Sequence, residues 1–96
     1  DGVNIQSKYC ASGNRCINEC FENDGKGTFR YMMDGKPMKI EVPSDKYDEA
    51  VRAMEEKIKN GQVKGVSDPN EAKNIVKKGH FTYAQAKNIA KAGTVE

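Results

Sequence analysis

The sequence contains no tryptophan and one histidine, and aromatic residues make up only 7% of its 96 residues. It has no apolar run near the roughly 20 residues that a membrane-spanning helix needs, and its mean hydropathy is -0.83. These absences exclude a membrane span within this stretch. No acid, base and nucleophile share a recognisable motif, so the sequence predicts a protein that is not an enzyme.

An excess of charge of one sign is also missing. The net charge is +2, from 16 basic and 14 acidic residues, whereas nucleic-acid-binding domains usually carry a strong basic excess. Residues 61–96 are mildly basic, with six lysines against three carboxylates. Nucleic-acid binding is therefore an alternative function, not the leading one. It would use the C-terminal lysines Lys73, Lys77, Lys78, Lys87 and Lys91.

The cysteines are odd in number, which argues against a complete disulfide framework. Cys10, Cys16 and Cys20 match no common zinc spacing, and His80 lies 60 residues beyond Cys20. We expect no metal and no cofactor, with these four residues as the only candidate ligands. Cys16 and Cys20 are four residues apart and fit buried positions on one helical face. A disulfide from Cys10 to Cys16 or Cys20 is the alternative.

Features typical of secreted proteins are absent as well. The sequence shows no signal peptide and no Asn-x-Ser/Thr sequon. Together with the odd cysteine, this predicts a reduced, cytoplasmic location. The missing initiator methionine suggests a fragment of a larger protein.

Residues 28–42 show the clearest β pattern, since apolar residues alternate with polar ones on both sides of a turn-forming DGKP sequence. We predict a hairpin with a four-residue loop, 34–37. That register places Arg30 opposite Glu41 and keeps Pro37, which has no N–H, out of the hydrogen-bond ladder. Val3 and Ile5 also alternate, which suggests a short edge strand near the N-terminus.

Two helices are predicted around this hairpin. Residues 45–59 carry an apolar stripe at spacings of four, three and four residues, formed by Tyr47, Val51, Met54 and Ile58. Residues 14–22 place Cys16, Ile17, Cys20 and Phe21 on one face, and Ser12 is the expected N-cap.

The last third contains an internal repeat. Residues 71–79 (EAKNIVKKG) match residues 85–93 (QAKNIAKAG) at six of nine positions. Each copy has helix-capping signals, and Thr82 with Gln85 forms a capping box for the second. We therefore predict a two-helix hairpin, 69–78 and 83–92. Ile75, Val76, Ile89 and Ala90 would pack against each other or against the β-hairpin.

The second copy with its flanks, KKGHFTYAQAKNIAKAG (77–93), resembles the short helical C-terminal modules found in many bacterial proteins. In those modules a Gly-x-apolar-Ser/Thr turn precedes a helix containing Glu or Gln. The stretch is also similar to uncharacterised bacterial proteins. The resemblance implies an oligomerisation or docking role, and it transfers no site residue.

Met32 interrupts the hairpin pattern, because it points away from the face of Phe29 and Tyr31. An exposed methionine beside open strand edges suggests a protein interface. Taken together, the sequence predicts one small α+β domain spanning residues 1–96. Its predicted function is a non-catalytic protein-interaction or regulatory module of a bacterial protein, which binds a protein partner or a second copy of itself.

Overall fold

The computed structural model describes residues 5–91 and is organised around a parallel sheet. The strands are β1 (Ile5–Ser7), β4 (Lys39–Val42) and β5 (Val76–Lys78), in the order β1-β4-β5. In the register, Gln6, Ile40 and Val76 lie side by side. The predicted α+β class and the short strand around Ile5 are confirmed, while Val3 lies outside the described residues.

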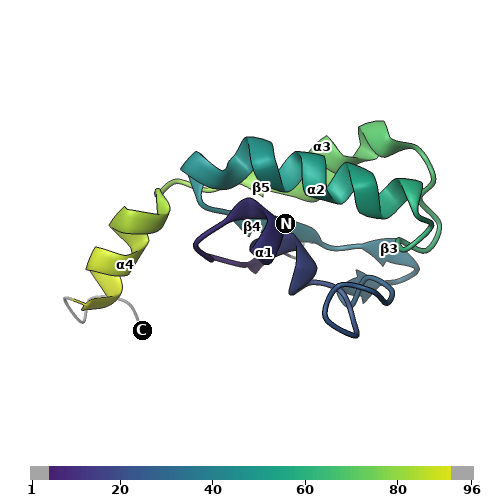
Figure 1. The fold of residues 1–96 in the computed structure, drawn as a ribbon, viewed down its shortest axis with the longest axis horizontal. Coiled ribbons are helices and arrows are strands. Elements are labelled where there is room, and N and C mark those ends of the chain that lie inside the picture. Colours follow the sequence, from purple (N-terminus) through teal and green to yellow (C-terminus); the bar gives the residue numbers. More distant parts are fainter. Residues whose placement is uncertain (1–4, 92–96) are drawn as a thin grey trace.

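Helix α2 (Tyr47–Lys59) covers one face of this sheet and lies across β4 and β5 (Figure 1). It matches the predicted helix 45–59, except that its first turn is the 3-10 helix η1 (Ser44–Lys46). Val51, Met54 and Ile58 are buried as the stripe requires, and Tyr47 is half-buried. Ile40 and Val42 from β4 complete this side of the core. The helix gives way to a turn at Gly61, whose φ of 77° suits glycine.

Helix α1 (Gly13–Asn18) packs against α2 and is shorter than the predicted 14–22. Ser12 caps it as expected, since its Oγ accepts the Arg15 N–H at 3.1 Å. The helix stops early because the following backbone pairs with residues 28–30. Arg30 N–H donates to the Cys20 carbonyl at 2.8 Å, and Phe21 forms a bridge with Phe29.

The predicted hairpin 28–42 forms only over β2 (Met32–Met33) and β3 (Lys36–Pro37). The predicted four-residue loop is wrong. Asp34 and Gly35 form a two-residue turn, and both have a positive φ, as the favoured hairpin turn requires. Met38 N–H donates to the Tyr31 carbonyl, so Pro37 falls between bonded positions, where its missing N–H costs nothing. Beyond the hairpin, β4 leaves for the parallel sheet, so Arg30 and Glu41 are not paired.

The predicted helix 69–78 is also wrong. The segment starts as the 3-10 helix η2 (Pro69–Glu71) and the single helical turn α3 (Ala72–Ile75), and then extends into β5. Val76 is fully buried beside Ile40. A β-branched residue loses little freedom in a strand, and here the strand also buries its side chain.

Helix α4 (Tyr83–Lys91) is the second copy of the repeat, and the predicted residue 92 lies outside the described part. Thr82 and Gln85 form the predicted capping box at its start. The predicted packing of two helices is wrong, because α4 points away from the sheet and α2 (Figure 1). It is tied to η1 instead: Ser44 N–H donates to Phe81 O, and Tyr83 N–H donates to Asp45 Oδ1 at 3.0 Å. Ile89 is half-buried and Ala90 is exposed.

Candidate functional site

An open groove of about 970 Å³ lies beside α1. Its walls come from the residue after β1, the outer side of α1, the loop that follows α1, and Arg30. The lining is mostly polar and contains both charge signs. Its charged members are Lys8, Arg15, Glu19, Glu22, Asp24 and Arg30.

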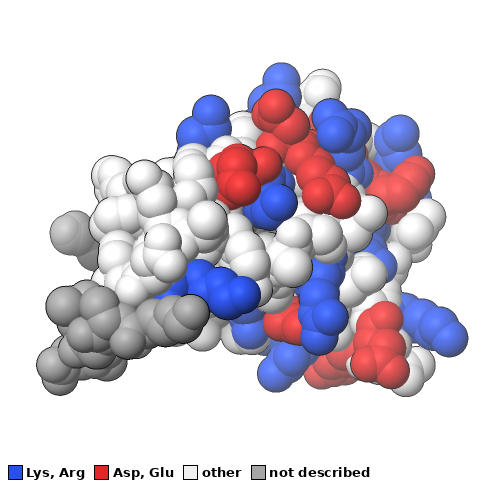
Figure 2. Space-filling model, turned by 60° about the vertical axis from the view of Figure 1, so that its left-hand side comes forward, with Lys and Arg blue, Asp and Glu red and all other residues white. Residues whose placement is uncertain are grey.

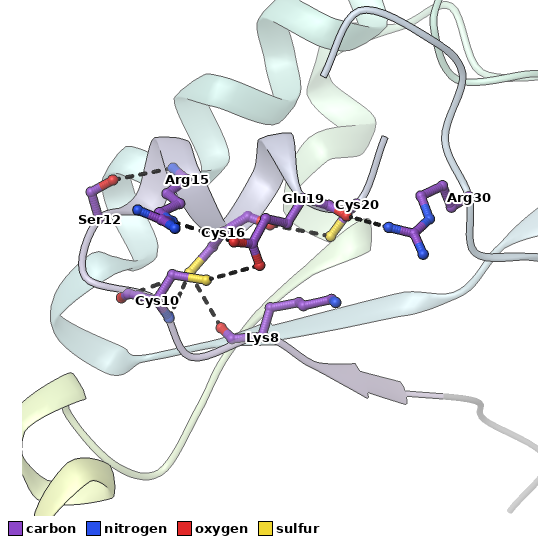
Figure 3. Close-up of polar contacts among 8 residues, drawn as sticks. All are labelled: Lys8, Cys10, Ser12, Arg15, Cys16, Glu19, Cys20 and Arg30. Atoms are coloured by element: carbon purple, nitrogen blue, oxygen red, sulfur yellow. Dashed lines mark hydrogen bonds and ion pairs between the residues drawn. The ribbon is translucent and has the colours of Figure 1, made fainter. Parts of the chain in front are cut away.

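Glu19 is the most connected side chain in this groove (Figure 3). Its carboxylate accepts from Arg15 Nε at 3.3 Å and from the Cys10 thiol at 3.4 Å. Its backbone carbonyl accepts from the Arg30 guanidinium at 3.0 Å. The Cys10 and Arg15 hydrogen bonds hold the pKa of Glu19 below its ordinary value. Glu19 therefore stays ionised and links α1 to the segments on both sides.

Lys8 and Arg30 share one aromatic neighbour. The Lys8 ammonium lies 5.2 Å from the Tyr31 ring centroid, and the Arg30 guanidinium carbon lies 5.5 Å from it. Contacts of this length are cation–π interactions. The Tyr31 side chain raises the pKa of Lys8, so this lysine stays charged over the physiological range. The sequence analysis did not identify Lys8 or Arg30 as site residues. The only local feature that could have indicated this site is the i,i+4 spacing of Arg15 and Glu19, which is typical of an ion pair on a helix.

The three cysteines lie on and around α1 and are free thiols (Figure 3). Cys16 and Cys20 are fully buried in the core, as the helical spacing predicted. Cys10 is half-buried, and its N–H donates to Cys16 Sγ at 3.2 Å. Burial is the main cause that raises the pKa of Cys10 and of Cys20 to about 12, and it raises the pKa of Cys16 as well. These thiols stay protonated and are poor nucleophiles and poor metal ligands.

The candidate metal ligands do not come together. His80 follows β5 and is exposed, whereas the cysteines lie around α1. Within residues 5–91, no group of three or more histidine, cysteine and acidic side chains is placed to hold a metal ion.

We expect Cys10 to react with iodoacetamide at pH 8 at least about a hundredfold more slowly than free cysteine, whose pKa is about 8.5. Glu19→Gln should speed this reaction severalfold, because it removes a carboxylate that helps to raise the pKa of Cys10. Burial, the larger cause, remains. Mass spectrometry of timed samples measures the rate.

Glu22→Gln is the matched control, since Glu22 lines the same groove and should leave the rate unchanged. A Cys10 rate equal to that of free cysteine would contradict the structure.

The raised pKa values of Cys10 and Cys20 also make stability depend on pH. In the unfolded chain these two thiols lose their protons near pH 9, and in the folded chain only near 12. The free energy of unfolding should therefore fall as the pH rises through this window.

The sheet has two open edges, and they differ in charge. Lys8 N–H donates to Glu41 O at 2.8 Å. Alternate residues of a parallel strand bond to the same neighbour, so the N–H groups of Ile5 and Ser7 point away from β4. Nothing within residues 5–91 pairs with this outer side of β1. The strand carries no charge, and Ile5 is 51% exposed.

The other edge, β5, contains Lys77 and Lys78. Gly79 N–H donates to Val42 O, so the same alternation turns the N–H groups of Val76 and Lys78 outward. Lysines on an edge strand discourage pairing with another strand. The edge of β1 is therefore the more favourable one for pairing with another chain.

Met32, the predicted interface residue, is half-buried and packs against the core. Its neighbour Met33 is the more exposed of the two, at 44%. The predicted exposure of Met32 is therefore wrong, because Met32, and not Met33, lies on the side of the hairpin that packs against the core.

The lysines of the nucleic-acid alternative are spread over three elements. Lys73 is exposed on α3, and Lys87 is exposed on α4. On β5, Lys77 is half-buried and Lys78 is exposed. The side chain of Lys91 lies outside the described part of the chain. On the face shown in Figure 2, basic and acidic side chains are interspersed and form no continuous basic area. The two-helix surface on which this alternative was based is not formed.

A small α+β domain with a parallel three-stranded sheet is thus the class of protein that the fold defines. The family model of the YeeR C-terminal domain matches residues 1–59, and the chain belongs to this family. The match covers α1, the groove, β1, β4 and α2. The predicted resemblance to bacterial proteins is confirmed, although this match lies N-terminal to residues 77–93.

A relative from Escherichia coli K12, the inner membrane protein YeeR, is 42% identical over 62 residues. These residues cover 65% of this chain and 12% of the relative, so the chain spans a small part of that protein's length. No solved structure matches. The predicted cytoplasmic location is contradicted, because the relative is named an inner membrane protein. Within residues 5–91, no helix is long and apolar enough to cross a membrane.

Proposed function

We propose that this domain is a non-catalytic protein-interaction module, in which the edge of β1 pairs with the same edge of a second copy. The observation that carries the proposal is the outward direction of the Ile5 and Ser7 N–H groups on an uncharged strand. Unpaired N–H and C=O groups on an exposed strand form a template for pairing with another strand.

A second copy fits this edge better than it fits the other one. An antiparallel pair of β1 strands centred on Gln6 would bring Ile5 of one copy beside Ser7 of the other. No like charges meet in this arrangement, whereas pairing two β5 edges would oppose lysines. The same patch serves both copies, as a two-fold interface requires.

The edge is short, so the expected association is weak, with a dissociation constant of about 0.1–1 mM. The Escherichia coli relative is named an inner membrane protein, and this name supports a role for weak pairing. If this domain is likewise held at a membrane, its copies have a raised effective concentration, and a weak contact between them is then occupied.

Ser7→Pro tests the proposal. Proline removes the outward N–H of Ser7 without touching the bonds from Gln6 and Lys8 to β4, and proline is tolerated on edge strands with this orientation. We expect sedimentation equilibrium to show a monomer–dimer equilibrium for the wild type and a monomer for Ser7→Pro. Circular dichroism checks that the variant is folded.

Ser7→Ala is the matched control. It removes the same hydroxyl, which donates to Glu41 at 3.4 Å, but keeps the backbone N–H. It should dimerise like the wild type. A wild type that stays monomeric at about 1 mM, or a Ser7→Pro variant that dimerises equally well, would refute the proposal. A free-thiol count on the same samples excludes dimers linked by a disulfide.

A further inference from the structure

The groove beside α1, called the α1 groove below, is lined by charged side chains that take no part in the proposed pairing of β1 edges. Lys8, Arg15 and Arg30 contribute three cations around Glu19, and Figure 3 shows Lys8 and Arg30 extending on the same side of α1. Both lie against the Tyr31 ring, at 5.2 Å and 5.5 Å from its centroid. Two of the cations that line the groove therefore share one aromatic neighbour.

The two cations lack carboxylate partners. Among the described residues, the ion pairs are Arg15 with Glu19 and Lys46 with Asp45, so Lys8 and Arg30 belong to none. Glu19 favours the charged form of Lys8, but it forms its ion pair with Arg15 and lies beyond ion-pair distance of Lys8. An anionic group near Lys8 and Arg30 would supply the missing counter-charge, and the Arg30 guanidinium, which donates to the Glu19 carbonyl, has further N–H donors for it.

A separate wall of the groove carries acidic side chains. Glu22 and Asp24 come from the loop after α1, and neither forms an ion pair among the described residues. Asn23 and Asp24 both have a φ of 55°, and two side chains from beyond the loop fix its backbone. Lys57 Nζ donates to Gly25 O at 2.6 Å, and Gln62 Nε2 donates to Gly25 O at 2.9 Å and to Gly27 O at 2.7 Å. The backbone of the loop that carries these two exposed carboxylates is therefore held in place.

We propose that the α1 groove binds a small zwitterion of the phosphoethanolamine type. Its phosphate lies between Lys8 and Arg30, and its ammonium faces Glu22 and Asp24. Guanidinium and ammonium groups are the usual partners of phosphate. The acidic wall repels ligands that carry only negative charge, such as nucleic acid, and favours a ligand with an ammonium group. The groove volume is in the range of small-molecule sites.

Nuclear magnetic resonance titration tests this proposal, with O-phosphoethanolamine, inorganic phosphate and ethanolamine as separate probes. We expect phosphoethanolamine to shift backbone amides around Lys8, Asn18, Asn23 and Arg30. Its affinity should exceed that of phosphate or ethanolamine at least tenfold. Equal affinities for phosphate and phosphoethanolamine, or shifts spread over the lysines outside the groove, would overturn the proposal.

Variants separate the groove from general charge effects. Lys8→Gln should weaken phosphoethanolamine binding about tenfold, and so should Glu22→Gln with Asp24→Asn. Lys64→Gln is the matched control, because Lys64 is exposed and outside the groove. Lys8 donates no side-chain hydrogen bond to the backbone in the described structure, so Lys8→Gln should stay folded. Unchanged binding by Lys8→Gln would contradict the assignment.

The same chemical group occurs free and as a lipid head group. Sedimentation with phosphatidylcholine vesicles, with and without phosphatidylethanolamine, distinguishes the two sources. Retention that depends on phosphatidylethanolamine and is lost in Lys8→Gln supports a lipid head group. Binding of free phosphoethanolamine without vesicle retention supports a soluble ligand. Binding of neither would refute the proposal, while the test of edge pairing by Ser7→Pro would be unaffected.

Discussion

Gly13→Ala is expected to lower the free energy of unfolding by about 3 kcal/mol, because overpacking a close contact costs about 1–3 kcal/mol or more. Gly13 is buried where α1 meets α2. A Cβ on this residue would lie 2.6 Å from Ala50 N, 2.8 Å from Glu49 Cβ and 2.8 Å from Lys46 O. Two of these atoms belong to the backbone of η1 and α2 and cannot move aside cheaply.

The same displacement weakens a specific contact. Gly13 N–H donates to Glu49 Oε1 at 2.9 Å, and this bond joins the start of α1 to α2. Chemical denaturation measures the loss, which corresponds to a fall in Tm of about 15 °C for a domain of this size. Asn14→Ala is the control, since Asn14 is exposed on the same turn and should change stability by less than about 0.5 kcal/mol. Equal stabilities of the two variants would show that α1 does not pack as described.

Val76→Ala is expected to destabilise the domain by about 2–3 kcal/mol. Val76 is fully buried beside Ile40, and each buried methyl group contributes roughly 0.8 kcal/mol, to which the cost of the cavity is added. Alanine also disfavours the strand relative to valine. Hydrogen exchange should show faster opening of β5 and of the hydrogen bonds that join β5 to β4.

The internal repeat supplies the matched control for this variant. Residue 90 is the alanine that aligns with Val76, and it is exposed on α4. Ala90→Val should therefore change stability by about 0.5 kcal/mol or less, since it costs only the difference in helix propensity. If Ala90→Val were as harmful as Val76→Ala, then α4 would be packed in a way that the structure does not show.

This repeat shows where prediction from the sequence failed. The two copies share six of nine residues and both carry helix-capping signals, yet residues 76–78 form a strand while residues 90–91 are helical. Local propensity is a weak preference, and the space beside β4 decides the outcome. The prediction of a long hairpin failed for a similar reason. Pairing on both sides, with β1 and β5, stabilises β4 more than extension of a two-stranded ribbon would.

The candidate sites were also only partly predictable. The burial of Cys16 and Cys20 was correctly predicted from their spacing of four residues, although Cys20 lies just beyond the end of α1. The groove was not predicted, because Lys8, Glu19 and Arg30 come from separate segments and meet only when α1 has packed. A short edge strand around Ile5 was expected, but pairing with a partner was expected at the hairpin around Met32. The parallel order β1-β4-β5 places β1 at an edge of the main sheet.

By itself, the sequence determined the α+β class, helix α2 with its buried stripe, the Ser12 and Thr82 caps and the burial of Cys16 and Cys20. All of these depend on residues within a few positions of each other, where helical periodicity and side-chain-to-backbone bonds act. Only the tertiary structure decided the parallel pairing of β1, β4 and β5, the strand at Val76 and the meeting of Lys8 with Arg30. These depend on which apolar surfaces bury one another across long stretches of chain, and that contribution to the free energy exists only when the segments meet.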